Sequence, residues 1–185
     1  MQKGGRKLSE KKEVYGKVKD QMRLSERIMA AIPGFHGYKE KELRRESDRL
    51  IRNHLHLKLS GAKNNLRTVS QKLADRRWLD VLTDMDRLIA KADRVSQKVN
   101  HASYGYAGFF DAIKIKEEHL DRMIDFDSKL IEDVNSLTAD IDTFKAEVTK
   151  GEVKNAKERI QAVTDKLEAV EEAFDKRQEV IVGVV

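Results

Sequence analysis

The feature that most constrains the fold is a pair of long heptad stripes separated by one short turn at Lys150-Gly151. On both sides of this turn, apolar residues recur at alternating intervals of three and four. This period is typical of helices that pack with a left-handed supercoil, and so short a turn makes two helices antiparallel neighbours. The sequence therefore predicts a helical hairpin that begins at Phe109 or Phe110. Its stripe positions are Leu120, Met123, Asp127, Leu130, Val134, Leu137, Ile141, Phe144 and Val148, then Val153, Ala156, Ile160, Val163, Leu167, Val170 and Phe174.

A first amphipathic helix is predicted from Lys7 to Ile32. It ends at Pro33, the only proline, because the residue before a proline is pushed out of the α region. Gly34 and Gly37 supply the backbone freedom for a sharp turn after it. The apolar positions of this helix are Leu8, Tyr15, Val18, Met22, Met29 and Ile32, with Ser25 filling one place.

A second helix is predicted to start near Lys39, and its length is open. It either stops at Gly61 or continues to a break near Arg77, since one helical glycine costs only about 1 kcal/mol relative to alanine. A third helix follows from Trp78 to Val99. The stripe of the second helix runs through Leu43, Ser47, Leu50, His54 and Leu57, then shifts register near Gly61 to Leu59, Ala62, Leu66, Val69 and Leu73. The expected fold is an all-α, elongated antiparallel bundle of about five helices with a coiled-coil-like hairpin.

Composition agrees with a thin bundle, because charged residues make up 37% of the chain and apolar residues only 39%. Each helix of a bundle buries one stripe and solvates the rest. The chain has no cysteine, which excludes disulfides and thiolate chemistry and fits a reducing compartment. It shows neither a signal peptide nor an apolar run of about 20 residues. A cytoplasmic location is therefore expected.

The predicted domain organisation is a flexible N-terminus over residues 1–6, one helical bundle over 7–179, and an apolar tail over 180–185. Five of the last seven residues are aliphatic. This tail either docks on the bundle, binds a partner, or precedes a segment that this sequence does not include.

Charge is unevenly distributed along the chain. Residues 1–60 carry 16 Lys/Arg and 8 Asp/Glu, whereas residues 100–185 carry 12 Lys/Arg and 19 Asp/Glu. In an antiparallel bundle, early and late segments lie side by side, so the two halves are expected to attract each other. The alternative is a basic surface for an anionic partner. Its candidate residues are Lys39, Lys41, Arg44, Arg45, Arg49 and Arg52, interleaved with acids such as Glu40, Glu42 and Glu46.

Most of the aromatic residues lie in two glycine-containing loops, at 33–38 and 103–110. If each helix folds back on the one before it, these loops share one end of the bundle, and the apolar tail returns there. Exposed aromatics beside glycines and basic groups can contact a partner. They can equally close the open end of an aliphatic core. The candidate partner-binding residues are Phe35, Tyr38, Tyr104, Tyr106, Phe109 and Phe110.

The sequence lacks a complete catalytic or metal-binding pattern. A di-iron bundle needs Glu-x-x-His motifs, but in Glu118-His119 the two residues are adjacent and point in different directions on a helix. Glu118, Asp121 and Asp125 have helix-neighbour spacing without a matching acidic pair on another helix, and His54 and His56 are two residues apart. We therefore expect a non-enzymatic interaction or scaffold protein that uses no cofactor, metal or small-molecule substrate.

Its expected partner is a protein or a second copy of the chain. The alternative is peripheral binding to an anionic membrane or nucleic acid through the basic N-terminal third. For a nucleic acid, such a surface gives salt-sensitive binding that ignores sequence. Asp127 falls at a heptad seam position, where a charge can fix the register or oligomeric state of a bundle.

Overall fold

The computed structural model describes residues 25–37, 41–102, 117–152 and 155–182. Within these ranges the chain is helical, and the predicted all-α class is confirmed. Residues 25–31 are helical and end just ahead of Pro33, as expected. The other elements are α2 (Lys41–Asp75), the short 3-10 helix η1 (Leu79–Val81), α3 (Leu82–His101), α5 (Glu117–Lys150) and α6 (Ala156–Val182).

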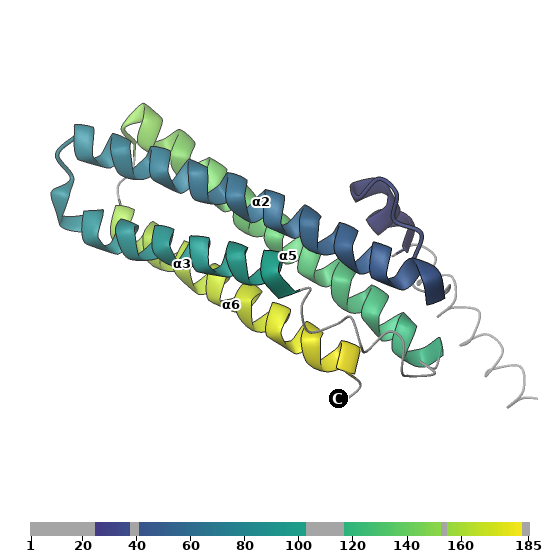
Figure 1. The fold of residues 1–185 in the computed structure, drawn as a ribbon. Coiled ribbons are helices and arrows are strands. Elements are labelled where there is room, and N and C mark those ends of the chain that lie inside the picture. The colour runs from purple at the N-terminus through teal and green to yellow at the C-terminus, as the bar shows by residue number, and fades with distance from the viewer. Residues whose placement is uncertain (1–24, 38–40, 103–116, 153–154, 183–185) are drawn as a thin grey trace, which may run out of the picture.

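The four long helices form an elongated bundle in which consecutive helices run in opposite directions (Figure 1). α2 packs against α3 and α5, and α6 packs against the same two helices. Between α3 and α6, Lys91 contacts Glu168 and Lys98 contacts Asp175, and both pairs are 77 positions apart. Between α2 and α5, Asn65 contacts Asp142 at an offset of 77, and Arg76, just after α2, contacts Thr149 at an offset of 73. Offsets that stay nearly constant along the helices indicate that α2 is parallel to α5 and that α3 is parallel to α6. The chain therefore folds as two helical hairpins laid side by side in the same direction.

One apolar core runs along the bundle and contains the stripes predicted for α5 and α6. Burying a Leu, Ile or Phe side chain stabilises a fold by roughly 1.5–3 kcal/mol, so these stripes account for much of the packing energy between the hairpins. The buried stripe residues of these two helices are Met123, Asp127, Leu130, Val134, Leu137, Ile141, Phe144, Val148, Ile160, Val163, Leu167, Val170 and Phe174.

The stripe predicted for the first half of α2 is wrong from Leu50 to Leu57, although Ser47 is buried as predicted and the side chain of Leu43 lies outside the described part. Leu57 is 63% exposed, and Leu50 and His54 are only partly buried. The core face carries Leu55 and Leu59 instead, each 1% exposed. It continues to Ala62, Leu66, Val69 and Leu73 with no change of register.

The error has a physical cause, because two seam positions ahead of Leu55 are occupied by the charged residues Asp48 and Arg52. Because these two positions are charged, the apolar spacing in the sequence matches a neighbouring face of the helix, which carries Leu50 and Leu57. The helix also continues through Gly61 to Asp75. Of the two predicted break points, the one near Arg77 is therefore correct.

α2 ends in a Schellman motif that has a non-glycine residue at its left-handed position. The backbone N–H of Trp78 donates to Leu73 O at 3.0 Å, and that of Arg77 donates to Ala74 O at 2.9 Å. Arg77 has φ 60, a conformation that an L side chain rarely adopts. α5 ends in the same way, with Gly151 at φ 77. Both hairpin turns therefore need a residue with positive φ after the helix, and the chain uses an arginine in one turn and a glycine in the other.

Arg77→Gly should raise the free energy of unfolding by about 1 kcal/mol, because glycine adopts positive φ without a Cβ clash. Denaturant unfolding followed by circular dichroism measures this difference. Arg77→Ala is the matched control, since it removes the same side chain but keeps the Cβ, and it should change stability by less than about 0.5 kcal/mol. Equal stabilisation by both variants would show that the arginine side chain, and not the backbone conformation, is responsible.

No helix within the described ranges combines the length and apolar character needed to cross a membrane. α6 extends to Val182, so the first three residues of the predicted apolar tail belong to a helix. Residues 183–185 lie outside the described part of the chain.

Candidate functional site

Among the described residues, four charged side chains are buried inside the bundle, near the end where α2 and α5 begin and α6 ends (Figure 1). Asp48 and Arg52 belong to α2, Asp127 to α5 and Arg177 to α6. Arg177 is only 1% exposed. We call these four residues the buried ionic cluster. Because they come from three helices, the cluster ties the two hairpins together at this end.

The buried ionic cluster is an alternating chain of acids and bases. Arg177 Nε donates to Asp127 Oδ1 at 2.5 Å, and its Nη2 donates to Asp127 Oδ2 at 3.3 Å. Arg177 Nη1 donates to Asp48 Oδ1 at 2.8 Å, and Arg52 Nε donates to Asp48 Oδ2 at 2.8 Å. Asp48 therefore lies between two guanidinium groups, and the two positive and two negative charges balance.

Such a cluster gives specificity more than net stability. Moving two ions out of water costs several kcal/mol, which their attraction and hydrogen bonds only roughly offset. Removing one partner is much worse, because it leaves an uncompensated buried charge. The arrangement therefore disfavours any helix register that separates Arg177 from Asp127 and Asp48.

The sequence indicates one of these positions and hides the others. Asp127 was predicted at a seam, and the structure confirms its burial there. Arg177 lies at the seam position that follows Val170 and Phe174 in α6. Extending the α6 heptad by one position would therefore have identified it. Asp48 and Arg52 carried no such signal, because the stripe assigned to this part of α2 was wrong.

The loop after Pro33 packs against the same end of α2. Ser47 Oγ donates to Gly37 O at 2.8 Å, and both Gly34 and Gly37 have φ 84. Phe35 is 2% exposed and belongs to the core. Its ring therefore closes the bundle here, so for this residue the packing role applies.

The other predicted partner-binding residues, Tyr38, Tyr104, Tyr106, Phe109 and Phe110, lie outside the described part of the chain. The helix ends that flank them are described. α2 begins at Lys41, α5 begins at Glu117 and α6 ends at Val182 toward one end of the bundle, and α3 runs toward that end (Figure 1). The described helices therefore lead toward one end of the bundle, and the meeting of the two segments there stays a prediction.

The residues predicted to form an anionic-surface site are divided by the structure. Arg45 is exposed, and Arg49 is exposed beside Glu46, which its Nη2 contacts at 2.7 Å. Arg52 is buried against Asp48 and is not part of the surface. Lys39 and the side chains of Lys41 and Arg44 lie outside the described part.

The two histidines of α2 have different surroundings. His56 Nδ1 lies 3.1 Å from both Ser96 O and Ser96 Oγ, and Ser96 Oγ lies 3.0 Å from Ser60 Oγ. These contacts form a polar link between α2 and α3. His54 is half-buried, and its Nε2 is the one buried side-chain polar atom without a partner in the described ranges.

Burial lowers the pKa of His54, and the nearby positive charge of Lys58 lowers it further. A histidine with a depressed pKa binds its proton more readily in the unfolded chain. The free energy of unfolding is therefore unaffected by this histidine above its unfolded pKa of about 6.5. It decreases as the pH falls from this value toward the lower folded pKa, because the unfolded chain takes up the proton first.

When the pH is lowered from about 7.5 to about 5.5, we therefore expect the melting temperature of His54→Gln to decrease less than that of the wild type. Thermal melts by circular dichroism at both pH values measure this loss. The exposed His101 supplies the control, and His101→Gln should keep the wild-type difference between the two pH values. An unchanged pH dependence in His54→Gln would assign the acid sensitivity to other groups.

The acidic residues at the start of α5 do not build a metal site with other described residues. Partial burial raises the pKa of Asp125, and the charge of Asp121 raises it further. Within the described residues, no group of three or more His, Asp or Glu side chains is arranged to hold a metal ion. The side chain of Glu118 lies outside the described part.

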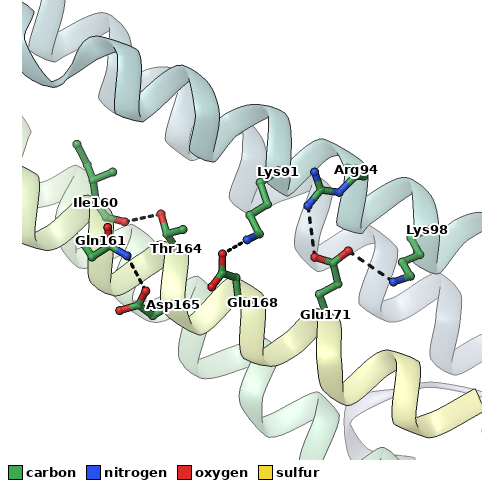
Figure 2. A network of polar contacts seen from close by, with 9 residues as sticks. All are labelled: Lys91, Arg94, Lys98, Ile160, Gln161, Thr164, Asp165, Glu168 and Glu171. Atoms are coloured by element: carbon green, nitrogen blue, oxygen red, sulfur yellow. Dashed lines mark hydrogen bonds and ion pairs between the residues drawn. The ribbon is translucent and has the colours of Figure 1, made fainter. Parts of the chain in front are cut away.

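A ladder of surface ion pairs joins α3 to α6 (Figure 2). Lys91 pairs with Glu168, Arg94 and Lys98 both reach Glu171 at 3.5 Å, and Lys98 also reaches Asp175 at 2.6 Å. The basic side chains come from the first hairpin and the acidic ones from the second. This seam therefore shows the expected attraction between the two halves of the chain.

A groove with a volume of about 420 Å³ lies at the opposite end of the bundle. It is open to solvent between η1 and the start of α6. Its lining combines Trp78, Val81 and Ala156 with the polar residues Asp80, Asn155, Lys157 and Glu158. These residues do not include a histidine, serine or cysteine that could act as a nucleophile or a neutral-pH base.

Comparison of the chain with protein-family models, with curated proteins and with solved structures gave no match.

Proposed function

We propose that this protein is a non-enzymatic helical-bundle interaction protein, whose partner contacts lie at the end formed by the 33–38 and 103–110 segments. The observation that carries the proposal is that, in the described ranges, the bundle pairs its buried charged side chains internally, and His54 Nε2 is the one buried side-chain polar atom without a partner. Asp48, Arg52, Asp127 and Arg177 satisfy one another, and Ser47 and Ser96 bond within the bundle. An interior arranged in this way holds helices in place and leaves function to the surface.

The choice of this end has two supports. The tyrosines and phenylalanines of residues 103–110 are concentrated in a segment that links α3 to α5, and aromatic residues are enriched at protein interfaces. The buried ionic cluster also lies near this end, and it holds α5, the helix that follows the segment, in register with α2 and α6. A fixed scaffold lowers the ordering cost of binding a partner. The partner is a protein or a second copy of the chain.

Affinity capture tests the proposal with the full chain as bait. Tyr104→Ala/Tyr106→Ala should lose a partner that the wild type recovers, while keeping the same melting temperature. The matched control is Leu57→Ala/Leu79→Ala, which truncates two exposed leucines on other surfaces and should keep the partner. Light scattering on the purified protein identifies a second copy as the partner. Identical recovery by both double variants would remove the aromatic segment from the proposal.

A further inference from the structure

Residues 25–37, which we call the strap, lie outside the arrangement of the four long helices and cross the seam between α2 and α5 (Figure 1). On the α5 side, Arg27 forms an ion pair with Glu132. On the α2 side, Gly37 O accepts the hydrogen bond from Ser47 Oγ. Because α2 belongs to the first hairpin and α5 to the second, the strap covers a seam between the two hairpins.

The strap presents one apolar face to this seam. Ile28, Ile32 and Phe35 are spaced four and three positions apart, and all three are buried. Beneath the strap, α5 contributes the buried residues Ser128 and Ile131, which line a groove together with Ile28. The seam therefore takes an amphipathic segment that carries two aliphatic side chains one turn apart and an aromatic side chain after them.

The strap is held more lightly than the long helices. Its ion pair with α5 joins two exposed side chains, and such pairs contribute little to stability. A groove of about 120 Å³ also remains between the strap and α5, so the apolar contact there is incomplete. Segments with few buried apolar contacts open at a lower free energy than the rest of a fold. We therefore expect the strap to leave its seat while the bundle stays folded.

The chain between the helix of the strap and α2 has the features of a hinge. The helix ends just ahead of Pro33, and Gly34 and Gly37 both have φ 84. Glycine changes its φ at little steric cost, and hinge motions are absorbed by a few residues of this kind. Only residues 38–40 then separate the strap from α2. So short a connection favours exchange of the segment between copies, because short hinge loops invite domain swapping.

We propose that the strap exchanges between two copies of the chain, so that each strap occupies the α2/α5 seam of the other copy. The second copy is the occupant because the seam already fits this sequence within one chain. A symmetric exchange forms the same contacts again, with Arg27 beside Glu132 of the other copy, and such exchange is a low-cost route to a dimer. It uses none of the residues 103–110 and is therefore independent of the partner contact proposed there.

Crosslinking of two single-cysteine variants tests the exchange, because the chain has no cysteine of its own. One full-length protein carries Arg27→Cys, and a second, distinguished by a size tag, carries Glu132→Cys. The two proteins are mixed over a range of concentrations and treated with a short bismaleimide. Each protein has one thiol, so a crosslink between them reports the strap of one copy on α5 of the other. In the matched control, Glu172→Cys, an exposed position on α6, replaces Glu132→Cys.

The protein with Arg27→Cys should crosslink to the protein with Glu132→Cys at least about tenfold more than to the control, because exchange holds the two thiols at a high effective concentration. Adding Ile28→Ser/Ile32→Ser to the Arg27→Cys protein should reduce the yield to the control level, with circular dichroism confirming that the bundle stays folded. Equal yields from the two pairs, or a yield that the isoleucine substitutions leave unaltered, overturn the proposal.

Light scattering on the wild type adds a second readout. A dimer that forms without this crosslink also overturns the exchange, in favour of another surface between copies. The outcome is separable from that of the proposed function, because the crosslinking varies residues 27, 28, 32 and 132, whereas the partner contact is tested at Tyr104 and Tyr106.

Discussion

Arg177→Leu should lower the free energy of unfolding by about 3–5 kcal/mol, the largest loss we expect from any single charged residue described in this bundle. The substitution leaves Asp127 without the guanidinium that contacts both of its oxygens, and it removes one of the two arginines that flank Asp48. A buried carboxylate that loses a paired guanidinium keeps its desolvation cost and loses that compensating attraction. Denaturant unfolding followed by circular dichroism measures the loss.

Arg94→Leu is the matched control, because Arg94 is an exposed arginine that reaches Glu171 at 3.5 Å across the same bundle. Exposed pairs contribute about 0–1 kcal/mol, so this variant should remain near the wild type. Arg177→Leu/Asp127→Leu should be more stable than Arg177→Leu alone, because it also removes the buried carboxylate that had paired with Arg177, while Asp48 keeps Arg52. If Arg177→Leu cost no more than Arg94→Leu, the buried ionic cluster would not hold the helices as described.

Leu55→Ala should destabilise the protein by about 2–5 kcal/mol, whereas Leu57→Ala should change its stability by less than about 0.5 kcal/mol. The two leucines are two positions apart on α2, but Leu55 is 1% exposed and Leu57 is 63% exposed. The first substitution leaves a cavity in the core, and the second removes a solvated side chain.

This pair decides between two registers of α2. The sequence pattern places Leu57 on the apolar stripe, and the structure places Leu55 there. Denaturant unfolding of the two single variants at the same pH measures the difference. A larger loss in Leu57→Ala than in Leu55→Ala would support the register expected from the sequence and contradict the structure.

The sequence predicted the fold wherever the heptad was uninterrupted. In α5 and α6 the three-four spacing identified both helices, the turn at Gly151 and the buried Asp127, because each stripe there has few polar breaks. The break near Arg77 was one of two alternatives, since a single helical glycine is a weak signal. The cost of Gly61 is small enough for the packing of α2 to absorb.

The candidate site could be predicted only in part, because a charge in a core is recognisable only beside its partners. Asp48 and Arg177 are 129 positions apart, and their pairing depends on how the two hairpins lie against each other. Periodicity describes one helix at a time and carries no such information. The same limit explains why Arg52 was expected on the surface, since its sequence neighbours resemble those of an exposed helix face.

Two kinds of ionic contact hold the bundle, and they should respond differently to salt. The ladder from Lys91 to Lys98 joins α3 to α6 at the surface, where salt screens the attraction. The buried ionic cluster lies out of reach of solvent and is screened much less. The ion pairs near Arg177 should therefore persist at salt concentrations that weaken the surface ladder. This difference suits the end at which we propose that partners bind.

Site-specific photo-crosslinking tests the central claim, that partners contact the end formed by the 33–38 and 103–110 segments, most directly. A photoreactive phenylalanine analogue replaces Tyr106 in one protein and Leu79 in another, and both are irradiated in the cells from which the partner is sought. Leu79 is the matched position, because it is 64% exposed at the opposite end of the bundle. The account predicts a discrete crosslinked species at position 106 and none at position 79. Crosslinking at position 79 alone, or equally at both positions, would contradict it.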